Sequence, residues 1–164
     1  DILALLRGGD TAQALHAARS SDDGHTWSAT VQVTGARQHP ADLALLANGD
    51  VLLTYGNRNP PYRIEGRISR DGGRSWLPHL LTFCGHLYGY TVTAPRPTDL
   101  GYPSTIVVDG VGVTLYYYNP SMRRGEGITR AESPALYSPD GYRAIGVVWD
   151  EAELVAAVER LAGL

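Results

Sequence analysis

An eight-residue pattern occurs twice in this chain and constrains its fold more than any other feature. Residues 20–27 read Ser-Ser-Asp-Asp-Gly-His-Thr-Trp, and residues 69–76 read Ser-Arg-Asp-Gly-Gly-Arg-Ser-Trp. In such a pattern the aspartate accepts hydrogen bonds from backbone N–H groups, the glycine adopts a positive φ, and the tryptophan packs beneath the turn. We therefore expect two similar turns, each joining a pair of antiparallel strands. A repeat at a spacing of about 50 residues is typical of folds built from successive similar units.

The composition agrees with a chain made of short strands and many turns. Among its 164 residues are 19 glycines and 10 prolines, scattered between short runs of Val, Leu, Ile, Thr and Tyr. This pattern favours an all-β fold over a helical bundle. The length suffices for one domain with a hydrophobic core. No apolar run approaches the length of a membrane span, so we expect no membrane-spanning segment.

Charge and reactive side chains exclude several kinds of function. The net charge is −3 and every basic residue is an arginine. Nucleic acid is not an expected partner because no basic stripe is present, and the absence of lysine excludes Schiff-base catalysis and a P-loop. Cys84 is the single cysteine, which excludes an internal disulfide and a cysteine metal cluster. No metal or other cofactor is expected, since metal-ligand spacing is missing among His16, His25, His79 and His86.

The cellular location stays open at the level of sequence. One thiol does not indicate a compartment, so both a secreted and a cytoplasmic bacterial protein fit. Asp1 is not a start methionine, and no basic-then-apolar leader precedes it, which suggests a processed or trimmed chain.

The order of apolar runs and turns predicts three successive units within a single domain, at about residues 1–36, 37–99 and 100–149. An Asn-Gly pair at residues 48 and 49, between two apolar runs, is a strong hairpin signal. The third unit follows the second closely but lacks the repeated pattern, and residues 131–140 stand in its place. The expected strands lie at residues 2–6, 12–19, 43–46, 51–55, 63–69, 106–108, 113–118, 127–130 and 144–149.

The end of the chain changes character and predicts a short helix at residues 150–163. Asp150 and Glu153 form a plausible capping pair at its start. Leu154 and Val158 fall on one helical face together with Leu161, so the helix is expected to dock against the sheets.

The repeated pattern resembles the Asp box of sialidases (neuraminidases) and of related β-propellers with BNR repeats. The resemblance implies a six-bladed β-propeller, of which this chain supplies about three blades as the C-terminal half. Because blades bury their apolar faces against one another, either a second copy of the chain or a missing N-terminal half is expected to complete the ring. The positions that carry the resemblance are expected to be structural: Ser20, Asp22, Gly24, Trp27, Ser69, Asp71, Gly73 and Trp76.

The resemblance also implies a sugar site at the propeller mouth. Residues 2–7 resemble the apolar strand that ends in one of the three arginines binding the sialic acid carboxylate, which makes Arg7 a candidate. Arg67 falls where another of these arginines stands, and Tyr102 falls where the catalytic tyrosine stands. Two further candidates for substrate contact are Arg58, on a connection rich in Asn and Pro, and His39, which opens its strand as Tyr102 opens the next.

Chemistry makes this set coherent for an acidic sugar. Planar guanidinium groups bind a carboxylate through paired hydrogen bonds. A tyrosine nucleophile avoids the repulsion that a carboxylate nucleophile would meet, and sialidases are the glycosidases that use it. In the family a glutamate activates this tyrosine and an aspartate is the acid/base. Both these residues and the first arginine lie, in the family pattern, upstream of the region with which this chain begins, so none is assigned.

Several alternatives stay open. The main hypothesis is a sialidase-like exo-glycosidase that removes terminal sialic acid, or a related acidic sugar, from glycoconjugates. The alternative from another class is a non-catalytic carbohydrate-binding or scaffold propeller, and a third is a hydrolase or lyase for another acidic sugar. Residues 55–62, 101–104 and 116–118 look like a bacterial branch of sialidase-like proteins. Structural roles also fit the candidates: a hairpin turn for Arg7, an outward strand position for Arg67, and a buried hydroxyl for Tyr102. The tyrosines at 116–118 are expected to alternate between core and channel rather than to form a stacking platform.

Overall fold

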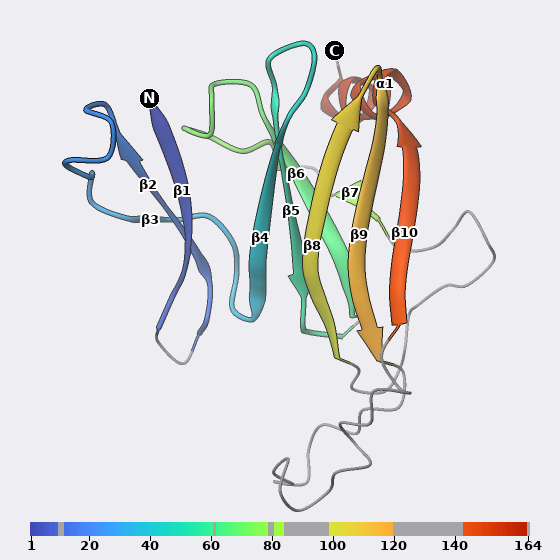
Figure 1. Cartoon of the computed structure of the whole chain (residues 1–164), viewed down its shortest axis with the longest axis horizontal. Coiled ribbons are helices and arrows are strands. Elements are labelled where there is room, and N and C mark those ends of the chain that lie inside the picture. The colour runs from blue at the N-terminus through green and yellow to red at the C-terminus, as the bar shows by residue number, and fades with distance from the viewer. Residues whose placement is uncertain (10–11, 61, 79–80, 84–98, 120–142, 164) are drawn as a thin grey trace, which may run out of the picture.

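The computed structural model describes residues 1–9, 12–60, 62–78, 81–83, 99–119 and 143–163 (Figure 1). Within them, antiparallel strands form three separate sheets and are followed by one helix. The first sheet contains β1 (Ile2–Arg7), β2 (Leu15–Ser20) and β3 (Val31–Gln32). The second contains β4 (Gln38–Leu45), β5 (Val51–Asn57), β6 (Arg63–Ser69) and β7 (Leu81–Thr82). The third contains β8 (Asp99–Val108), β9 (Val111–Asn119) and β10 (Arg143–Asp150), and α1 (Glu151–Ala162) follows.

This arrangement confirms an all-β chain with one short C-terminal helix. The hairpin expected at Asn48 and Gly49 joins β4 to β5, and Gly49 has a φ of +87°. The expected strand at residues 144–149 is β10, which pairs directly with β9. The strand expected at residues 127–130, and the segment 131–140 that replaces a repeat, lie outside the described residues. The division into three units of one propeller domain stays a prediction.

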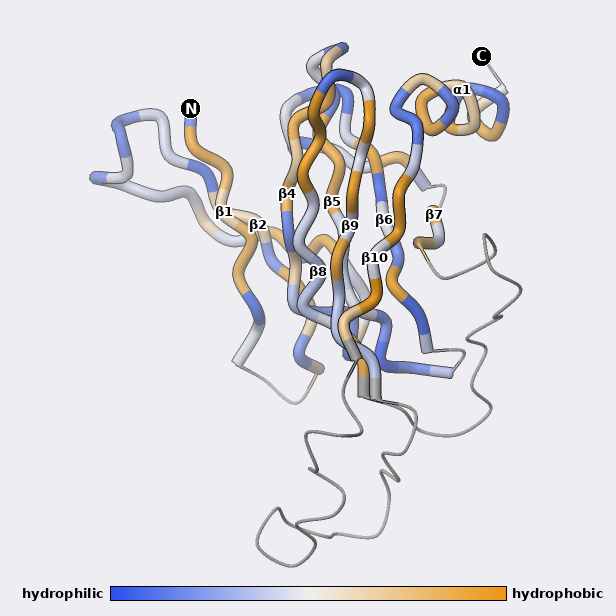
Figure 2. Tube along the Cα trace, turned by 45° about the vertical axis from the view of Figure 1, so that its right-hand side comes forward, coloured by the Kyte–Doolittle hydropathy of each residue, from blue (hydrophilic) through white to orange (hydrophobic). Residues whose placement is uncertain are grey.

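The sheets stand side by side with the axes of their long strands roughly aligned, so the assembly of sheets has two distinct ends (Figure 1). We call the end where β4 and β8 begin and where β1, β5 and β9 finish the bulge end. The opposite end, which carries the β4–β5 and β8–β9 hairpins, the repeated turns and α1, is the hairpin end. Apolar (orange) stretches lie along the strands in Figure 2.

Two apolar clusters hold neighbouring sheets together. The cluster between the first and second sheets centres on Leu15, Leu53 and Tyr55, with Trp76 packed against it. The cluster between the second and third sheets is larger and includes Val158 of α1. Its other buried members are Leu46, Leu52, Tyr62, Ile64, Ile68, Phe83, Leu100 and Tyr116. Alternation along β5 explains the division, because successive side chains of a strand point to opposite faces.

Helix α1 covers the hairpin end of the larger cluster. The Asp150 side chain accepts a hydrogen bond from the Glu153 backbone N–H at 2.9 Å, which confirms the expected cap. Gly163 ends the helix in the left-handed conformation with a φ of +71°. Glu151 is buried and its carboxylate accepts the backbone N–H of Ala47, so the start of the helix is tied to the β4–β5 hairpin.

The two repeated turns have the same hydrogen-bond design. In the first, the Ser20 hydroxyl donates to Asp22 at 2.7 Å and accepts the Gly24 N–H at 2.8 Å. Asp22 also accepts the N–H and the hydroxyl of Thr26, and these bonds lower its pKa to about 2. In the second, Ser69, Asp71 and Ser75 repeat the same contacts: Ser69 donates to Asp71 at 2.8 Å, and Ser75 donates its hydroxyl at 2.6 Å.

The two tryptophans of the repeats differ in their surroundings. Trp76 is partly buried between the first and second sheets, as expected. Trp27 is 46% exposed, although its indole N–H donates to the Gly24 carbonyl at 3.0 Å. Trp27 lies beside Ile2 on the outer face of the first sheet, and none of the described sheets covers that face. The expected burial beneath the turn therefore needs a neighbouring sheet, which only Trp76 has.

Candidate functional site

The bulge end takes its name from two equivalent irregularities in β4 and β8. The register of β4 with β5 shifts between Gln38 and Ala41, and that of β8 with β9 shifts between Gly101 and Ser104. Each bulge contains an X-Pro pair, His39-Pro40 in β4 and Tyr102-Pro103 in β8. A bulge bends its strand and redirects a side chain, and bulges recur next to active sites. His39 and Tyr102 thus occupy matching places, as the sequence predicts.

Tyr102 is presented to solvent in an unfavourable backbone conformation. Its φ is +50°, in the left-handed region that large side chains rarely adopt. The preceding Gly101 has a φ of +149°, which is open essentially to glycine alone. The Tyr102 side chain is 57% exposed, so a strained backbone holds this phenol in solvent instead of burying it. Residues held in this way cluster at ligand and active sites.

Tyr102 belongs to a small constellation that joins the second and third sheets. Its ring lies 5.7 Å from the ring of Tyr117 of β9, at an interplanar angle of 35°. The Tyr117 hydroxyl accepts a hydrogen bond from Arg58 Nη2 at 3.1 Å. Arg58 is only 8% exposed, and a Cβ atom on Gly101 would lie 3.2 Å from its Nη2. A buried positive charge thus lies beside two phenol rings that are in contact with each other.

His39 occupies the matching bulge but is fully buried. Its Nε2 lies 3.1 Å from Oε1 of Gln13, which reaches it from the connection between β1 and β2. Gln13 itself has a φ of +50°. The structure therefore places His39 at the expected end of β4, while its ring is covered rather than turned to solvent.

Arg67 lies elsewhere, between the first and second sheets. It pairs with Leu53 across β5 and β6, and its Nη1 donates to the Val33 carbonyl at 3.3 Å. Beside it, burial raises the pKa of Tyr55 to about 12, with a further contribution from the negative charge of Glu65. The Tyr55 hydroxyl and Arg67 Nε are buried and have no hydrogen-bond partner among the described residues. The structure does not bring Arg67 together with Tyr102.

The carboxylates near these residues are engaged by the protein itself. Glu65 is fully buried and accepts hydrogen bonds from Arg63 Nε at 2.6 Å and Asn57 Nδ2 at 2.8 Å. Asp42 accepts the Thr105 backbone N–H at 2.6 Å, and burial raises its pKa. Neither carboxylate contacts Tyr102, so none takes the place of the glutamate or the acid/base aspartate that the family resemblance requires.

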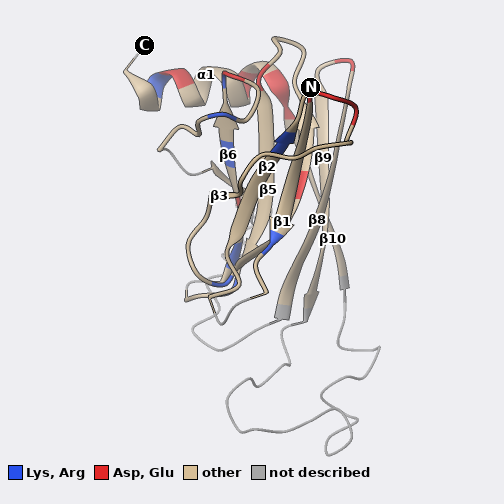
Figure 3. Cartoon of the chain, turned by 90° about the vertical axis from the view of Figure 1, so that its left-hand side faces the viewer, with Lys and Arg blue, Asp and Glu red and all other residues tan. Residues whose placement is uncertain are grey.

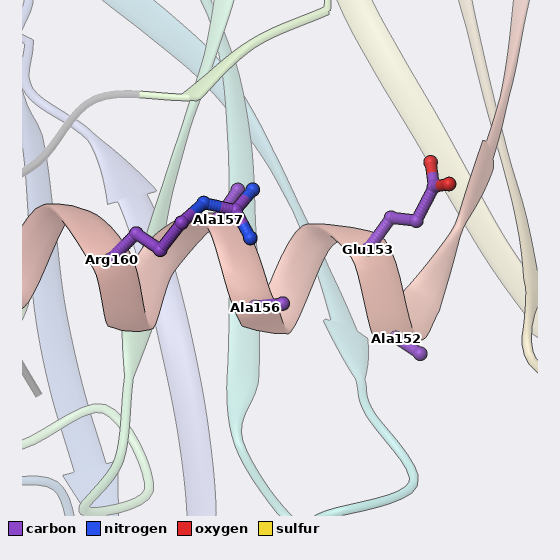
Figure 4. Close-up of a pocket in the computed structure, with 5 residues that line it drawn as sticks. All are labelled: Ala152, Glu153, Ala156, Ala157 and Arg160. Carbon is purple, nitrogen blue, oxygen red and sulfur yellow. The ribbon is translucent and has the colours of Figure 1, made fainter.

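Arg7 lies at the bulge end of the first sheet, two sheets away from Tyr102. It is exposed and lines a shallow hollow of about 320 Å³ with Leu6, Gly8, Gly9, His16 and Thr30. A second hollow of about 710 Å³ lies along α1 at the hairpin end, where Glu153 and Arg160 flank small side chains (Figure 4). Its other lining residues are alanines, which offer a ligand no directed polar contacts. The hollow along α1 is therefore not the candidate site.

Charge is distributed unevenly between the two ends. Figure 3 shows the acidic residues gathered mainly at the hairpin end, whereas basic residues lie at both ends. Among the described side chains the bulge end carries Arg7, Arg37, Arg58 and Arg63, with Glu65 as a buried counter-charge. The acidic residues of the hairpin end include Asp1, Asp22, Asp23, Asp50, Asp71, Asp109, Asp150, Glu151, Glu153 and Glu159. Such a distribution attracts anions to the bulge end.

Sequence reasoning missed the roles of Tyr117, Gln13 and Arg37. Tyr116 packs in the core and Tyr117 points to the other face, as expected, but Tyr117 also forms a ring contact with Tyr102. The signal for Tyr117 is the hairpin register, because counting back from the pair Val108 and Val111 brings residue 117 opposite the bulge, where it pairs with Gly101. Gln13 and Arg37 adopt left-handed backbone conformations for which their residue types give no signal.

Comparisons with known proteins agree with the β-rich fold. No family model matches the sequence, and no curated protein is significantly similar to it. Among solved structures, the chain is similar to a polysaccharide lyase of family PL25, an ulvan lyase, with a TM-score of 0.50 and 18% identity over 70% of this chain and 26% of the lyase. It is also similar to the GH93 α-L-arabinofuranosidase of Fusarium graminearum, with a TM-score of 0.49 and 14% identity over 84% of this chain and 38% of that enzyme.

The chain matches only a part of each of these enzymes. The chain spans about a quarter of the lyase and under two fifths of the arabinofuranosidase. Both are carbohydrate-active enzymes, and neither is a sialidase, so the sialidase resemblance stays a prediction. Within the described residues no helix is long and apolar enough to cross a membrane. No group of three or more His, Cys, Asp or Glu side chains there is suited to hold a metal ion.

Proposed function

We propose that this chain is part of a carbohydrate-active β-propeller that binds an acidic sugar at the bulge end. One observation carries the proposal: a strained, exposed Tyr102 stacks on Tyr117, whose hydroxyl is held by the buried Arg58. Aromatic faces with a few fixed polar groups are the usual lining of ligand sites. The positive charge behind the two phenols favours a carboxylate on the ligand. The fold likeness to a polysaccharide lyase supports a saccharide as the ligand, although fold by itself does not determine function.

For the reaction, we propose sialidase-like exo-glycosidase chemistry with Tyr102 as nucleophile. A phenol is a suitable nucleophile beside a substrate carboxylate because it is neutral until it reacts. Arg58 stabilises negative charge that develops on the phenols, since a nearby cation favours the ionised form. The base and the acid that this mechanism requires are supplied outside the described residues. Of the candidate arginines, Arg58 is the one that contacts the Tyr102–Tyr117 pair, so we assign the first acidic sugar to Arg58 rather than to Arg7 or Arg67.

A second candidate function is β-elimination by a lyase. Here an ionised tyrosine removes the proton next to the carboxylate of a uronic acid, and the leaving sugar departs to give an unsaturated product. The observation that favours it is the engagement of Glu65 and Asp42 by the protein, because a lyase of this kind needs no carboxylate acid/base pair. A non-catalytic binding propeller is the remaining alternative, and it shares the same ligand end.

Parallel assays of the complete protein distinguish these functions. Release of an aryl group from an aryl sialoside reports hydrolysis, and ultraviolet absorbance of a new double bond in a uronate oligosaccharide reports elimination. We expect Tyr102→Phe to reduce the active reaction at least about a hundredfold while ligand binding persists, as for loss of a nucleophile or general base. Tyr118→Phe, a neighbouring tyrosine packed on the core, is the control. Full activity of Tyr102→Phe would contradict the catalytic role, and binding without turnover of either substrate would favour the non-catalytic function.

We also propose that the outer faces of the first and third sheets are covered in the working protein. The third sheet exposes Ile106, Val108, Val111, Leu115 and Val148, and the first exposes Ile2, Leu6 and Trp27. Apolar faces of this kind mark interaction surfaces. A second copy of the chain or further sheets of a longer protein would provide the cover. Light scattering distinguishes the two, since a particle of about twice the mass of one chain indicates a second copy.

A further inference from the structure

Arg37, which precedes β4 by one residue, adopts a left-handed backbone conformation that its residue type does not favour. Its φ is +60° although it is neither glycine nor asparagine. Two other left-handed residues of the same kind, Gln13 and Tyr102, lie at the same end of the sheets. The remaining left-handed non-glycine residues, Asp23 and Asp109, lie in turns at the hairpin end, where aspartate tolerates this conformation. Backbone strain at the bulge end is therefore concentrated around the candidate site.

Backbone hydrogen bonds fix Arg37 on both sides. Its N–H donates to the Ala12 carbonyl at 2.7 Å, and its own carbonyl accepts the Arg58 N–H at 2.9 Å. The Asn59 side chain donates to the adjacent Ala36 carbonyl at 2.8 Å. Arg37 thus joins the β1–β2 connection of the first sheet to the connection that carries Arg58. Through Arg58 and Tyr117 the same series of contacts reaches Tyr102.

The Arg37 side chain is exposed and engages nothing in the described part of the chain. Other arginines are neutralised locally: Arg63 by Glu65 at 2.6 Å, and Arg74 by Asp1 at 3.2 Å. Arg37 has no such hydrogen bond or ion pair among the described residues. A cation with a fixed backbone and no partner in the described part of the chain is available to bind an external anion.

Arg37 also extends the positive charge away from Tyr102. Arg58 lies behind Tyr102 at the junction of the second and third sheets, whereas Arg37 lies where the second sheet meets the first, and Arg7 ends β1 beyond it. The arginines form a row across the three sheets rather than a cluster around one point. Arginines that bind one sugar carboxylate must converge on it, whereas arginines spread along a row fit a chain that carries several carboxylates.

We propose that Arg37 binds an acidic group of the ligand other than the one beside Tyr102. The ligand is then a saccharide chain with carboxylates on successive sugars, and Arg37 is a specificity-determining residue for the second of them. This inference rests on the proposed function, because it takes the Tyr102 end as the place of the first acidic sugar. A guanidinium recognises this group by a paired, charge-assisted hydrogen bond.

The test compares two probes, N-acetylneuraminic acid and its linear tetramer, by isothermal titration on the complete protein. The wild type is expected to bind the tetramer more tightly than the monomer. Arg37→Gly is expected to weaken tetramer binding about tenfold, the effect of one charge-assisted contact, and to leave monomer binding unchanged. Glycine suits the φ of +60°, so this variant removes the side chain without adding strain. Arg70→Ala, an exposed arginine at the hairpin end, is the matched control and should bind both probes as the wild type does.

The possible results separate this inference from the function on which it rests. If Arg37→Gly leaves both affinities unchanged, or if the wild type binds monomer and tetramer equally, the role of Arg37 is wrong and the proposed function stands. If Arg37→Gly weakens both probes equally, Arg37 belongs to the first sugar's subsite and the inference also fails. If the wild type binds neither probe, the proposed sialic acid function itself is contradicted. Selective loss of tetramer binding supports the inference.

Discussion

At the scale of single residues, left-handed backbone at non-glycine positions marks both ends of the sheets for different physical reasons. Asp23 and Asp109 adopt it in tight turns, where a short polar side chain lowers its cost. Gln13, Arg37 and Tyr102 gain no such help, and hydrogen bonds from neighbouring sheets hold two of them in place. The strain at the bulge end is thus imposed by tertiary contacts, as expected where side-chain position matters for binding.

The repeated turns give a prediction about pH. Hydrogen bonds, chiefly from Thr26, lower the pKa of Asp22 from 3.8 to about 2. A lowered folded-state pKa adds stability that is complete above the unfolded value and is lost as the pH falls through the folded value. Asp22→Asn should therefore lower the thermal midpoint at pH 7, and the difference from wild type should shrink as the pH falls from about 5 to about 2.

The control for this titration is the neighbouring carboxylate. Asp23 lies in the same turn, with a φ of +57° that asparagine tolerates, and its side chain accepts no hydrogen bond from the residues that the structure describes. Asp23→Asn should leave the midpoint close to wild type at every pH. A difference between Asp22→Asn and wild type that persists undiminished at pH 2 would show that the carboxylate charge is not the cause.

At the scale of elements, the second repeated turn is also a docking piece. A Cβ atom on Gly73 would overlap Leu3 Cδ2 of β1, and the Arg19 side chain donates to the Gly72 carbonyl. The first turn has no such neighbour, since a Cβ atom on Gly24 would meet only Trp27 at 3.8 Å and Ile2 at 3.9 Å. The two turns therefore share one hydrogen-bond pattern, but of the two only the second joins one sheet to the next.

This difference predicts unequal costs for one substitution at matched positions. Both glycines have positive φ, +84° at Gly73 and +90° at Gly24, so alanine adds backbone strain of about 1–2 kcal/mol at either site. Gly73→Ala also forces Leu3 aside, and overpacking costs about 1–3 kcal/mol more. Urea unfolding should show Gly73→Ala to be the less stable variant. Equal losses at the two sites would mean that the turn does not support the first sheet.

Some elements of the fold could be predicted from the sequence, and others could not. The turns, the Asn48-Gly49 hairpin and the capped helix depend on local chemistry, so they could be predicted from neighbouring residues. The matching of His39 and Tyr102 also follows from a local X-Pro pattern. Their unequal exposure does not, because Gln13 covers His39 from another sheet. The strand that carries Arg67 could be predicted from the sequence. Which sheet faces the Arg67 side chain could not, because that depends on the packing of distant segments.

At the scale of the whole molecule, the two ends of the sheets differ in structure and in charge. The hairpin end holds the repeated turns, the hairpins and α1, and its charges are mainly acidic (Figure 3). The bulge end holds strained residues, stacked tyrosines and a row of arginines. The central claim is that an acidic saccharide binds at the bulge end, and that claim concerns the position of the ligand on the molecule more than any single side chain.

A crystal structure of the complete protein with a bound acidic oligosaccharide tests this claim most directly. The tetramers of N-acetylneuraminic acid and of galacturonic acid are the two ligands to soak, because each presents carboxylates on successive sugars. The account predicts one sugar against the exposed ring of Tyr102, with its carboxylate near Arg58 and the next carboxylate on Arg37. An ordered oligosaccharide in the hollow along α1, or elsewhere at the hairpin end, with an empty bulge end, would contradict it.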